Sequence, residues 1–513
     1  MHREVGVLMN MKPIKPVVIA IVFFLLVLNG PTGVCAGSDA PALVSRVSAQ
    51  VLTARGIPLL CRLPEGLVVS LSAEQRASLP EDAECLWLPG GRKEGLYVLE
   101  FPAGMPAELA RQTDALVLAD NRLILAVTES EAEYWSARGA ELRKLFLEQK
   151  PAGVNAADLP QSVPYNMVVA QTIAQIETAY LMQHISWLSG QEPVTVDGAA
   201  YTIVTRHSRK PEEIAKATQY AYAFFTSLGY STEFFYFDGP GDRNVIALKP
   251  GTSLPDQYVV LCAHIDDMPW GDVAPGADDN ATGCVSVMAA AELLVALPLE
   301  RSVIFALWTG EEQGLHGSHH YAAYAASSGM DIAAVINLDM VGWDGVNGPD
   351  FALHAATAQL PGSRDLAEVF ADAVTTYGLD LAPQILDQGT DRSDHASFWD
   401  YGYSAILGIE TYDDFNPYYH TIYDRMEYIN TTYFTAAAKA SLAALMHTAG
   451  VSDVLQGDID GSGRVDGLDL ILLGMAFGAS QGEGRYNPGA DLDRSLTVDG
   501  QDLAILAAYF GRM

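Results

Sequence analysis

The sequence predicts an α/β domain over residues 165–452, because strand-like and helix-like segments alternate along this part of the chain. Apolar runs rich in β-branched and aromatic residues predict strands at 231–237, 244–249, 258–263, 302–308, 333–338 and 404–408. Helices are expected at 167–188, 211–228, 284–297 and 314–328. Two adjacent acids, Glu311 and Glu312, follow the strand that ends at Trp308. Ligands of open α/β sheets bind at this edge, so the acidic pair marks a candidate site.

The regions on either side of this domain differ in composition. The 513 residues are enough for about two to four domains. Residues 37–164 predict a small α+β region, with strands at 66–71, 95–101 and 115–119, a helix at 129–148 and a linker over 150–164. This region is either a propeptide or an accessory domain. Residues 453–513 form a separate, acidic module.

Residues 1–36 have the pattern of a secretory signal peptide. Arg3, Lys12 and Lys15 precede the apolar run 17–28, and Val34-Cys35-Ala36 ends in a small residue suited to cleavage. The apolar run is too short to span a bilayer comfortably. We therefore expect a secreted or periplasmic protein that has no membrane partner once the signal is removed; lipid attachment through Cys35 is the alternative.

The charge of the chain limits its partners. The net charge of −33 argues against binding to nucleic acid and to anionic membranes, and it suits a protein whose carboxylates bind cations. Cys262 and Cys284 lie in apolar stretches and are expected in the core. Cys61 and Cys85 are candidates for a disulfide in an oxidising compartment, which sequence alone does not decide.

Metal-ligand residue types follow several predicted strands or lie in loops near them. Besides the acidic pair, they are His264, Asp266, Asp278, Asp339 and His420. Two histidines together with three of these carboxylates suit two divalent ions better than one. A bridging carboxylate holds two such ions roughly 3.5–4 Å apart with a water between them. A neighbouring glutamate that is not a ligand then takes the proton of that water.

These motifs resemble the M28 family of dizinc aminopeptidases, in family order over about residues 165–450. They are His264-Ile-Asp266, Gly276-Ala-Asp-Asp-Asn-Ala-Thr-Gly283, Glu311-Glu-Gln-Gly314, Asn337-Leu-Asp339 and His420-Thr-Ile-Tyr-Asp424. The resemblance implies a mixed, mostly parallel sheet flanked by helices, with two zinc ions at the strand ends.

The resemblance also implies roles for individual residues. Asp278 would bridge the two metals, Glu312 and His420 would complete one site, and His264 and Asp339 the other. Glu311 matches the general base and Asp266 the acid that orients His264. Ser393 and Asp394 belong to a segment that lies beside the site in the family, so they are supporting candidates.

Several nearby residues have more than one interpretation. Asp279 is expected mainly to shape the turn, and Asp424 either supports His420 or caps the next segment. Arg392 forms a surface ion pair or meets a substrate carboxylate. Some secreted M28 members have a cysteine pair and a tyrosine where this chain has 389–392. A further set, expected on a solvated helix face, comprises His316, His319 and His320.

The C-terminal module repeats with a period of 33 residues, and each copy has the oxygen spacing of a calcium loop. The candidate ligands of the first loop are Asp458, Asp460, Ser462, Arg464 (through its carbonyl), Asp466 and Asp469. Those of the second loop are Asp491, Asp493, Ser495, Thr497, Asp499 and Asp502. The repeat resembles a type I dockerin module, which implies two Ca²⁺ ions and a cohesin-bearing scaffold protein as partner. Leu496 replaces Gly463 at a position that favours a left-handed backbone.

The sequence thus leads to one main functional hypothesis and three alternatives. The main hypothesis is an exported dizinc aminopeptidase that acts on peptide substrates and carries a dockerin. A carboxypeptidase of the same fold is the first alternative, and Arg392 is its only indication. A glutaminyl cyclase-like enzyme with one metal is the second, and an inactive, receptor-like binding module is the third.

Overall fold

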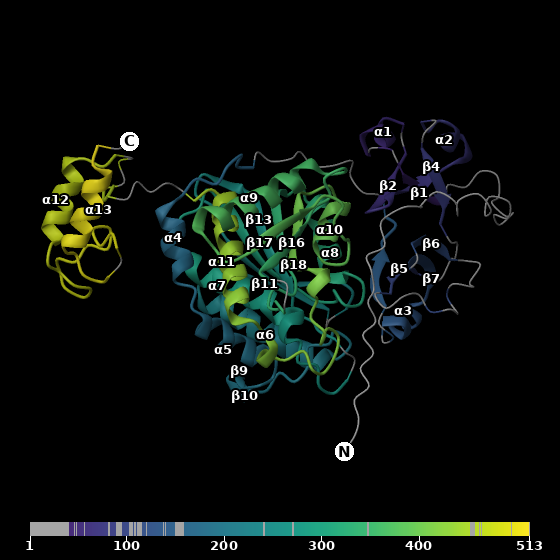
Figure 1. Ribbon diagram of the computed structural model, residues 1–513, viewed down its shortest axis with the longest axis horizontal. Coiled ribbons are helices and arrows are strands. Elements are labelled where there is room, and N and C mark those ends of the chain that lie inside the picture. Colours follow the sequence, from purple (N-terminus) through teal and green to yellow (C-terminus); the bar gives the residue numbers. More distant parts are fainter. Residues whose placement is uncertain are drawn as a thin grey trace, which may run out of the picture.

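The computed structural model describes residues 40–511, apart from 89–94, 102–105, 107–108, 110–114, 149–158, 452–456 and several gaps of one or two residues. The predicted signal peptide lies outside the described residues. Figure 1 shows an N-terminal region, a central α/β domain and a C-terminal pair of helices. Among the helices of the described part, none is long and apolar enough to cross a membrane.

The central domain is built on an eight-stranded mixed sheet. In spatial order its strands are β11 (Ser231–Tyr236), β12 (Arg243–Lys249), β14 (Arg301–Trp308), β13 (Leu254–His264), β15 (Asp331–Leu338), β18 (Ala405–Glu410), β16 (Asp350–His354) and β17 (Ala382–Leu386). The four strands β14, β13, β15 and β18 run parallel to their neighbours in this group. The expected mixed α/β sheet is therefore confirmed, and parallel strands occupy its centre.

Helices cover both faces of this sheet, because alternate residues of each strand point to opposite sides. In β13, Val259 and Leu261 pack into one core and Val260 and Cys262 into the other. The first core is closed by α4 (Met167–Ala174), α5 (Thr178–Leu188), α6 (Pro211–Ser227), α7 (Gly283–Leu294), α9 (Pro361–Tyr377) and α11 (Thr431–Thr448). The second is closed by α8 (His316–Ser327) and α10 (His395–Asp400). A short hairpin, β9 (Val194–Val196) and β10 (Ala199–Tyr201), lies outside the sheet.

Two predicted helices differ from the structure. The stretch 167–188 is two helices, because α4 ends at Ala174 and Glu177 begins α5. The stretch 129–148 is a helix only in its first half, α3 (Glu129–Ser136), and continues as strand β8 (Glu141–Leu145). Strand pairing of β8 with β5 decides this second half, and it buries Arg143 and Leu145.

The N-terminal region contains two four-stranded sheets with the same strand order. The first has the order β2-β3-β1-β4 and consists of β1 (Ala40–Ser45), β2 (Leu59–Leu63), β3 (Gly66–Leu71) and β4 (Glu84–Trp87), with α1 (Ala49–Ala54) and α2 (Ala73–Ala77). The second has the order β6-β7-β5-β8 and consists of β5 (Gly95–Glu100), β6 (Leu116–Ala119), β7 (Arg122–Val127) and β8. Cys61 and Cys85 lie on the two outer strands of the first sheet and are not joined in a disulfide.

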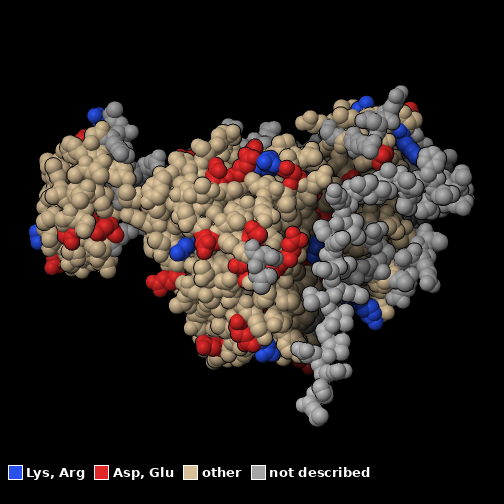
Figure 2. All heavy atoms as spheres, viewed as in Figure 1, with Lys and Arg blue, Asp and Glu red and all other residues tan. Residues whose placement is uncertain are grey.

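The C-terminal module is a pair of short helices, α12 (Gly467–Ala476) and α13 (Gly500–Tyr509), each preceded by an acidic loop. Its small core contains the repeated residues Val465, Leu473, Val498 and Leu506. Acidic side chains outnumber basic ones on the face that Figure 2 shows, in agreement with the net charge.

Candidate metal centre

Three neighbouring parallel strands bring the candidate ligands together. β13 ends at His264, β14 ends three residues before Glu311, and β15 ends one residue before Asp339. Since their order in the sheet is β14-β13-β15, their carboxyl ends lie side by side. Asp279, from the turn Ala277–Thr282, and His420, from the loop after β18, complete the cluster.

The carboxylate of Asp279 lies between the two histidines. Its Oδ1 is 3.3 Å from Nε2 of His264, and its Oδ2 is 3.3 Å from Nε2 of His420. Asp339 Oδ1 is 3.2 Å from Nε2 of His264, and Glu312 Oε2 is 2.8 Å from Nε2 of His420. The five side chains therefore form two groups of three that share Asp279.

This donor set fits two divalent cations. Imidazole nitrogens and carboxylate oxygens are the ligands that zinc takes, and in each group they lie within 4.8 Å of one another. Glu312 Oε1 is buried without a hydrogen-bond partner, although buried polar atoms normally have one. A cation beside Glu312 would satisfy this atom.

The charges in this pocket perturb one another strongly. Burial alone would lower the pKa of His420, but Glu312 and Asp279 outweigh it and raise that pKa to about 10. Burial raises the pKa of Glu312 to about 7, against the opposing effect of His420. The pKa of Glu311 also lies well above its usual range, first because of burial and then because of Glu312. The pocket thus gathers more negative charge than its two histidines can balance, which favours added positive charge.

The structure corrects the assignment of Asp278 as the bridging ligand. Its carboxylate points away from the histidines and accepts hydrogen bonds from Asn416 Nδ2 (2.9 Å) and from the Gly342 N–H (2.8 Å). The adjacent Asp279 occupies the bridging place instead. Because the turn is tight, neighbouring side chains leave it in different directions, and the order of two adjacent acids does not reveal which one faces the metals.

Asp424 holds the turn Ala277–Thr282 through hydrogen bonds to its backbone. Its carboxylate accepts the backbone N–H groups of Asp278 (3.0 Å) and Asp279 (2.9 Å). Neither of the two roles considered for it, support of His420 or capping of the next segment, describes these contacts. Burial raises the pKa of Asp424 to about 8, and Asp278 adds to the rise. The bridging carboxylate is therefore positioned through its own backbone.

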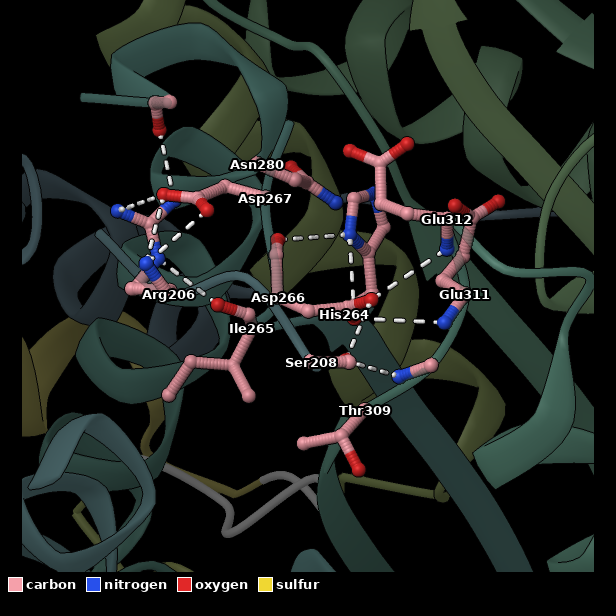
Figure 3. Close-up of polar contacts among 12 residues, drawn as sticks. Arg206, Ser208, His264, Ile265, Asp266, Asp267, Asn280, Thr309, Glu311 and Glu312 are labelled. Atoms are coloured by element: carbon pink, nitrogen blue, oxygen red, sulfur yellow. Dashed lines mark hydrogen bonds and ion pairs between the residues drawn. The ribbon is translucent and has the colours of Figure 1, made fainter. Parts of the chain in front are cut away.

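Asp266 organises the opposite side of the site (Figure 3). Its carboxylate accepts a hydrogen bond from Ser208 Oγ (3.0 Å) and weaker ones from the N–H groups of Glu311 and Glu312 (both 3.4 Å). The carbonyl of Asp266 lies 3.2 Å from His264 Nδ1, whereas its carboxylate is 3.8 Å away. Asp266 thus fixes the ring of His264 through its backbone and the acidic pair through its side chain.

Arg206 is a buried support that the sequence did not reveal. Its guanidinium is fully buried, pairs with Asp267, and donates to the carbonyls of Ile265 (2.8 Å) and Gly276 (2.9 Å) (Figure 3). These contacts tie the loop after His264 to the turn that carries Asp279. Arg206 and Ser208 belong to no motif of chemistry-bearing residues, so the pattern gave no signal for either.

The segment around Ser393 supports the site as expected. Ser393 Oγ donates to Asp339 Oδ2 (2.7 Å) and accepts from Asn337 Nδ2 (2.8 Å). Asp394 is completely buried, and burial raises its pKa to about 8. Arg392 is largely buried rather than on the surface, and it pairs with Glu141 and Glu100 of the N-terminal region.

The three histidines of α8 do not form a solvated face. His316 and His319 are buried, and the ring of Phe146 stacks on His319 with 3.6 Å between centroids. His316 and His320 both face Asp238 at 3.2 Å. The N-terminal region covers this helix, which residue spacing within the helix did not predict.

Two adjoining cavities lead to the ligand cluster. The inner one, of about 20 Å³, is lined by His264, Asp279, Glu311, Glu312 and Asp339. The outer one, of about 670 Å³, shares four lining residues with it: Arg392, Tyr412, Phe415 and Tyr419. Tyr419, whose ring stacks on His420 with 3.7 Å between centroids, was not among the predicted site residues, although it precedes His420 directly.

The C-terminal loops bring together three carboxylates each: Asp458, Asp460 and Asp469 in the first, and Asp491, Asp493 and Asp502 in the second. Asp466 and Asp499 instead cap α12 and α13 with their side chains. Leu496 has the left-handed backbone (φ 68°) expected at its position.

Comparison with known proteins finds similar peptidases. Residues 244–445 match the model of Peptidase family M28. A probable leucine aminopeptidase of Trichophyton verrucosum is 26% identical over 321 residues, which cover 59% of this chain and 80% of the relative. A probable zinc metalloprotease of Leptosphaeria maculans is 28% identical over 39% of this chain and 56% of its own length. The crystal structure of the Legionella pneumophila LapA aminopeptidase shares the fold (TM-score 0.55, 20% identity, 70% of this chain and 99% of that chain).

The corrected bridging residue is testable with two adjacent substitutions. Asp279→Asn removes a charge shared by both ligand groups, so we expect the bound zinc to fall by at least one ion per chain. Asp278→Asn keeps the shape of the side chain but replaces one of its two acceptor oxygens, which meet Gly342 N–H and Asn416 Nδ2. Because these contacts lie outside the ligand cluster, the variant should retain both ions. Zinc content of the dialysed proteins, measured by atomic emission, checks this. Full zinc in Asp279→Asn together with loss in Asp278→Asn would restore the original assignment.

Proposed function

We propose that this chain is an exported aminopeptidase that uses two zinc ions to release N-terminal residues from peptides. The M28 domain and the similar leucine aminopeptidase and zinc metalloprotease support a zinc-dependent aminopeptidase. The observation that carries the finer proposal is the pair of ligand groups joined by Asp279. Five donors in two groups favour two ions over the single metal of a glutaminyl cyclase-like site.

Zinc and Glu311 have different roles in the proposed hydrolysis. Zinc, when bound, polarises the scissile carbonyl and makes a water more acidic. Glu311 lies within 4.8 Å of donor atoms of His264 and Glu312, and it lines the inner cavity. It takes the proton of the attacking water and passes it to the leaving amine. Its carboxylate holds that proton between the two steps.

Tyr419 is placed to stabilise the tetrahedral intermediate. It lines both cavities, and burial together with Asp279 and Glu312 keeps the pKa of its phenol well above the usual value. The phenol therefore remains protonated and donates a hydrogen bond to a developing oxyanion. It takes the place of the tyrosine that some secreted M28 members have before the Ser-Asp-His segment.

The charged lining of the cavities favours an aminopeptidase over a carboxypeptidase. A carboxypeptidase needs a cation that is free to meet the substrate carboxylate. Arg392 is engaged by Glu141 and Glu100, and Arg122, the other arginine lining the outer cavity, pairs with Glu65 and Asp391. Among the described lining residues, every arginine thus has an acidic partner.

Export and attachment complete the proposal. The basic and apolar pattern of residues 1–36 supports secretion, and the two acidic loops of the C-terminal module support binding of two Ca²⁺ ions. In this proposal the module is a dockerin that attaches the enzyme to a cohesin-bearing scaffold. Exposed apolar side chains on its helices, including Leu468, Ile471 and Met475, offer a contact surface for that partner.

Substrate class is tested with the purified chain. We expect release of p-nitroaniline from leucine p-nitroanilide and none from its N-acetylated form, because the amine must be free. A zinc chelator should abolish the release and added zinc restore it. Cleavage of N-blocked peptides from their C-terminal end would favour the carboxypeptidase instead.

The role of Glu311 is tested by Glu311→Gln, with exposed Glu368→Gln as control. Losing the proton acceptor should lower kcat by about two to four orders of magnitude while zinc content stays at wild-type level. The control should match wild type in both measurements. Full activity in Glu311→Gln would remove Glu311 from the mechanism.

The C-terminal loops are tested by hydrogen exchange with and without calcium. Calcium should slow exchange of the backbone amides in both loops and in α12 and α13, since the ions would hold the carboxylates of each loop together. Asp469→Ala should abolish the effect in the first loop only. Equal exchange with and without calcium after Gly457 would contradict the assignment.

A further inference from the structure

Strand β8 of the N-terminal region contacts two segments that lie beside the candidate metal centre. The Lys144 N–H bonds the carbonyl of Gly314, two residues after Glu312, at 3.4 Å. On the other side, Arg143 pairs with Asp391 and Glu141 pairs with Arg392. One strand therefore reaches the loop after β14 and the segment before α10.

The N-terminal region binds Asp391 of the central domain through buried charged contacts, as in a permanent interface. Arg122 donates two hydrogen bonds to its carboxylate (2.7 and 2.8 Å), and Arg143 also bonds Asp400 (2.9 Å). Asp391 is only 1% exposed with the N-terminal region in place, so replacing the two arginines in the intact chain would leave its charge buried and uncompensated. Burial alone would raise the pKa of Asp391, but the two guanidinium groups lower it to about 2.

This interface is connected to the metal ligands by a short path. Asp391 lies two residues before Ser393, whose hydroxyl bonds the carboxylate of Asp339 at 2.7 Å. Asp339 belongs to one of the two ligand groups. The orientation of a metal ligand depends on such hydrogen-bond partners, and their loss typically weakens metal binding by about 10- to 100-fold.

The N-terminal region does not plug the inner cavity. The lining residues of that cavity run from His264 to Tyr419, so none of them comes from the described part of the N-terminal region. Glu65, Glu100, Asn121, Arg122 and Glu141 line the outer cavity instead. The region thus forms a wall around the approach to the metals and leaves the ligand cluster open to it.

We propose that the N-terminal region is a resident part of the working enzyme rather than a blocking propeptide, and that Arg143 is a positioning residue for the metal centre. Arg143 acts through Asp391 on the segment that holds Ser393 and Asp339, while the backbone of β8 braces the loop of Glu311 and Glu312. This inference rests on the proposed zinc site, and it assigns the outer wall of the substrate cavity to residues 40–148.

The test is Arg143→Gln in the full-length chain, with Arg138→Gln as control. Arg138 is an exposed arginine of the same region whose guanidinium lies over Tyr134. We expect Arg143→Gln to release zinc to a chromogenic chelator at least ten times faster than wild type. On leucine p-nitroanilide we expect at least a tenfold lower kcat with a smaller change in KM. Arg138→Gln should match wild type in all three quantities.

Each other outcome speaks against the proposal. Higher activity of Arg143→Gln would identify the region as an inhibitor, and unchanged zinc release with unchanged kcat would make it a passive neighbour. Zinc release is measured without substrate, so it tests the role of Arg143 separately from the proposed activity. If wild type were inactive but Arg143→Gln still released zinc ten times faster than wild type, only the proposed activity would be overturned.

A second experiment covers failure of Arg143→Gln to fold. A specific protease site inserted into 149–158 allows the folded full-length protein to be cut between the two parts. We expect the two fragments to elute together in gel filtration at moderate salt, with kcat within twofold of the uncut protein. Separation of the fragments with retained or increased activity would contradict the proposal.

Discussion

The concentration of carboxylates at one buried sheet edge is the constraint on which the rest of the structure depends. Glu311, Glu312 and Asp339 follow the ends of parallel strands, and Asp279 meets them from the turn Ala277–Thr282. The chain cannot separate the first three without losing its central sheet. Such a group of charges is costly to bury unless cations or protons balance it. The same arrangement that destabilises the cation-free pocket therefore gives it affinity for divalent ions.

Much of the surrounding structure serves to hold backbone in place rather than to touch a ligand. Asp424 accepts the N–H groups of the turn that carries Asp279, and Asp266 accepts those of the acidic pair. Arg206 joins the loop after His264 to the turn that carries Asp279 from a fully buried position. Because these groups fix main-chain atoms, the ligand side chains need few contacts of their own and keep their lone pairs for cations.

The sequence predicted what depends on local pattern and missed what depends on tertiary contact. The long apolar strands were placed within a few residues, because burial on both faces leaves a continuous hydrophobic run. Residues 141–145 were predicted as helix, although their pairing with β5 makes them a strand. In the site, four of the five side chains in the cluster were among the predicted ligands. The choice between Asp278 and Asp279 depended on a turn geometry that two adjacent identical residues do not encode.

The role of the N-terminal region also depends on tertiary contacts rather than on local sequence pattern. Its arginines have no motif, so a reading of the sequence left a propeptide and an accessory domain equally open. A propeptide that blocks a site places its own side chains in that site. Here the described side chains stop at the outer cavity, and departure would strip Asp391 of both its arginines. Asp391 lies two residues from Ser393, whose hydroxyl orients Asp339. The charge balance of this interface therefore affects the geometry of the metal centre, and both are maintained when the N-terminal region and the central domain are in place.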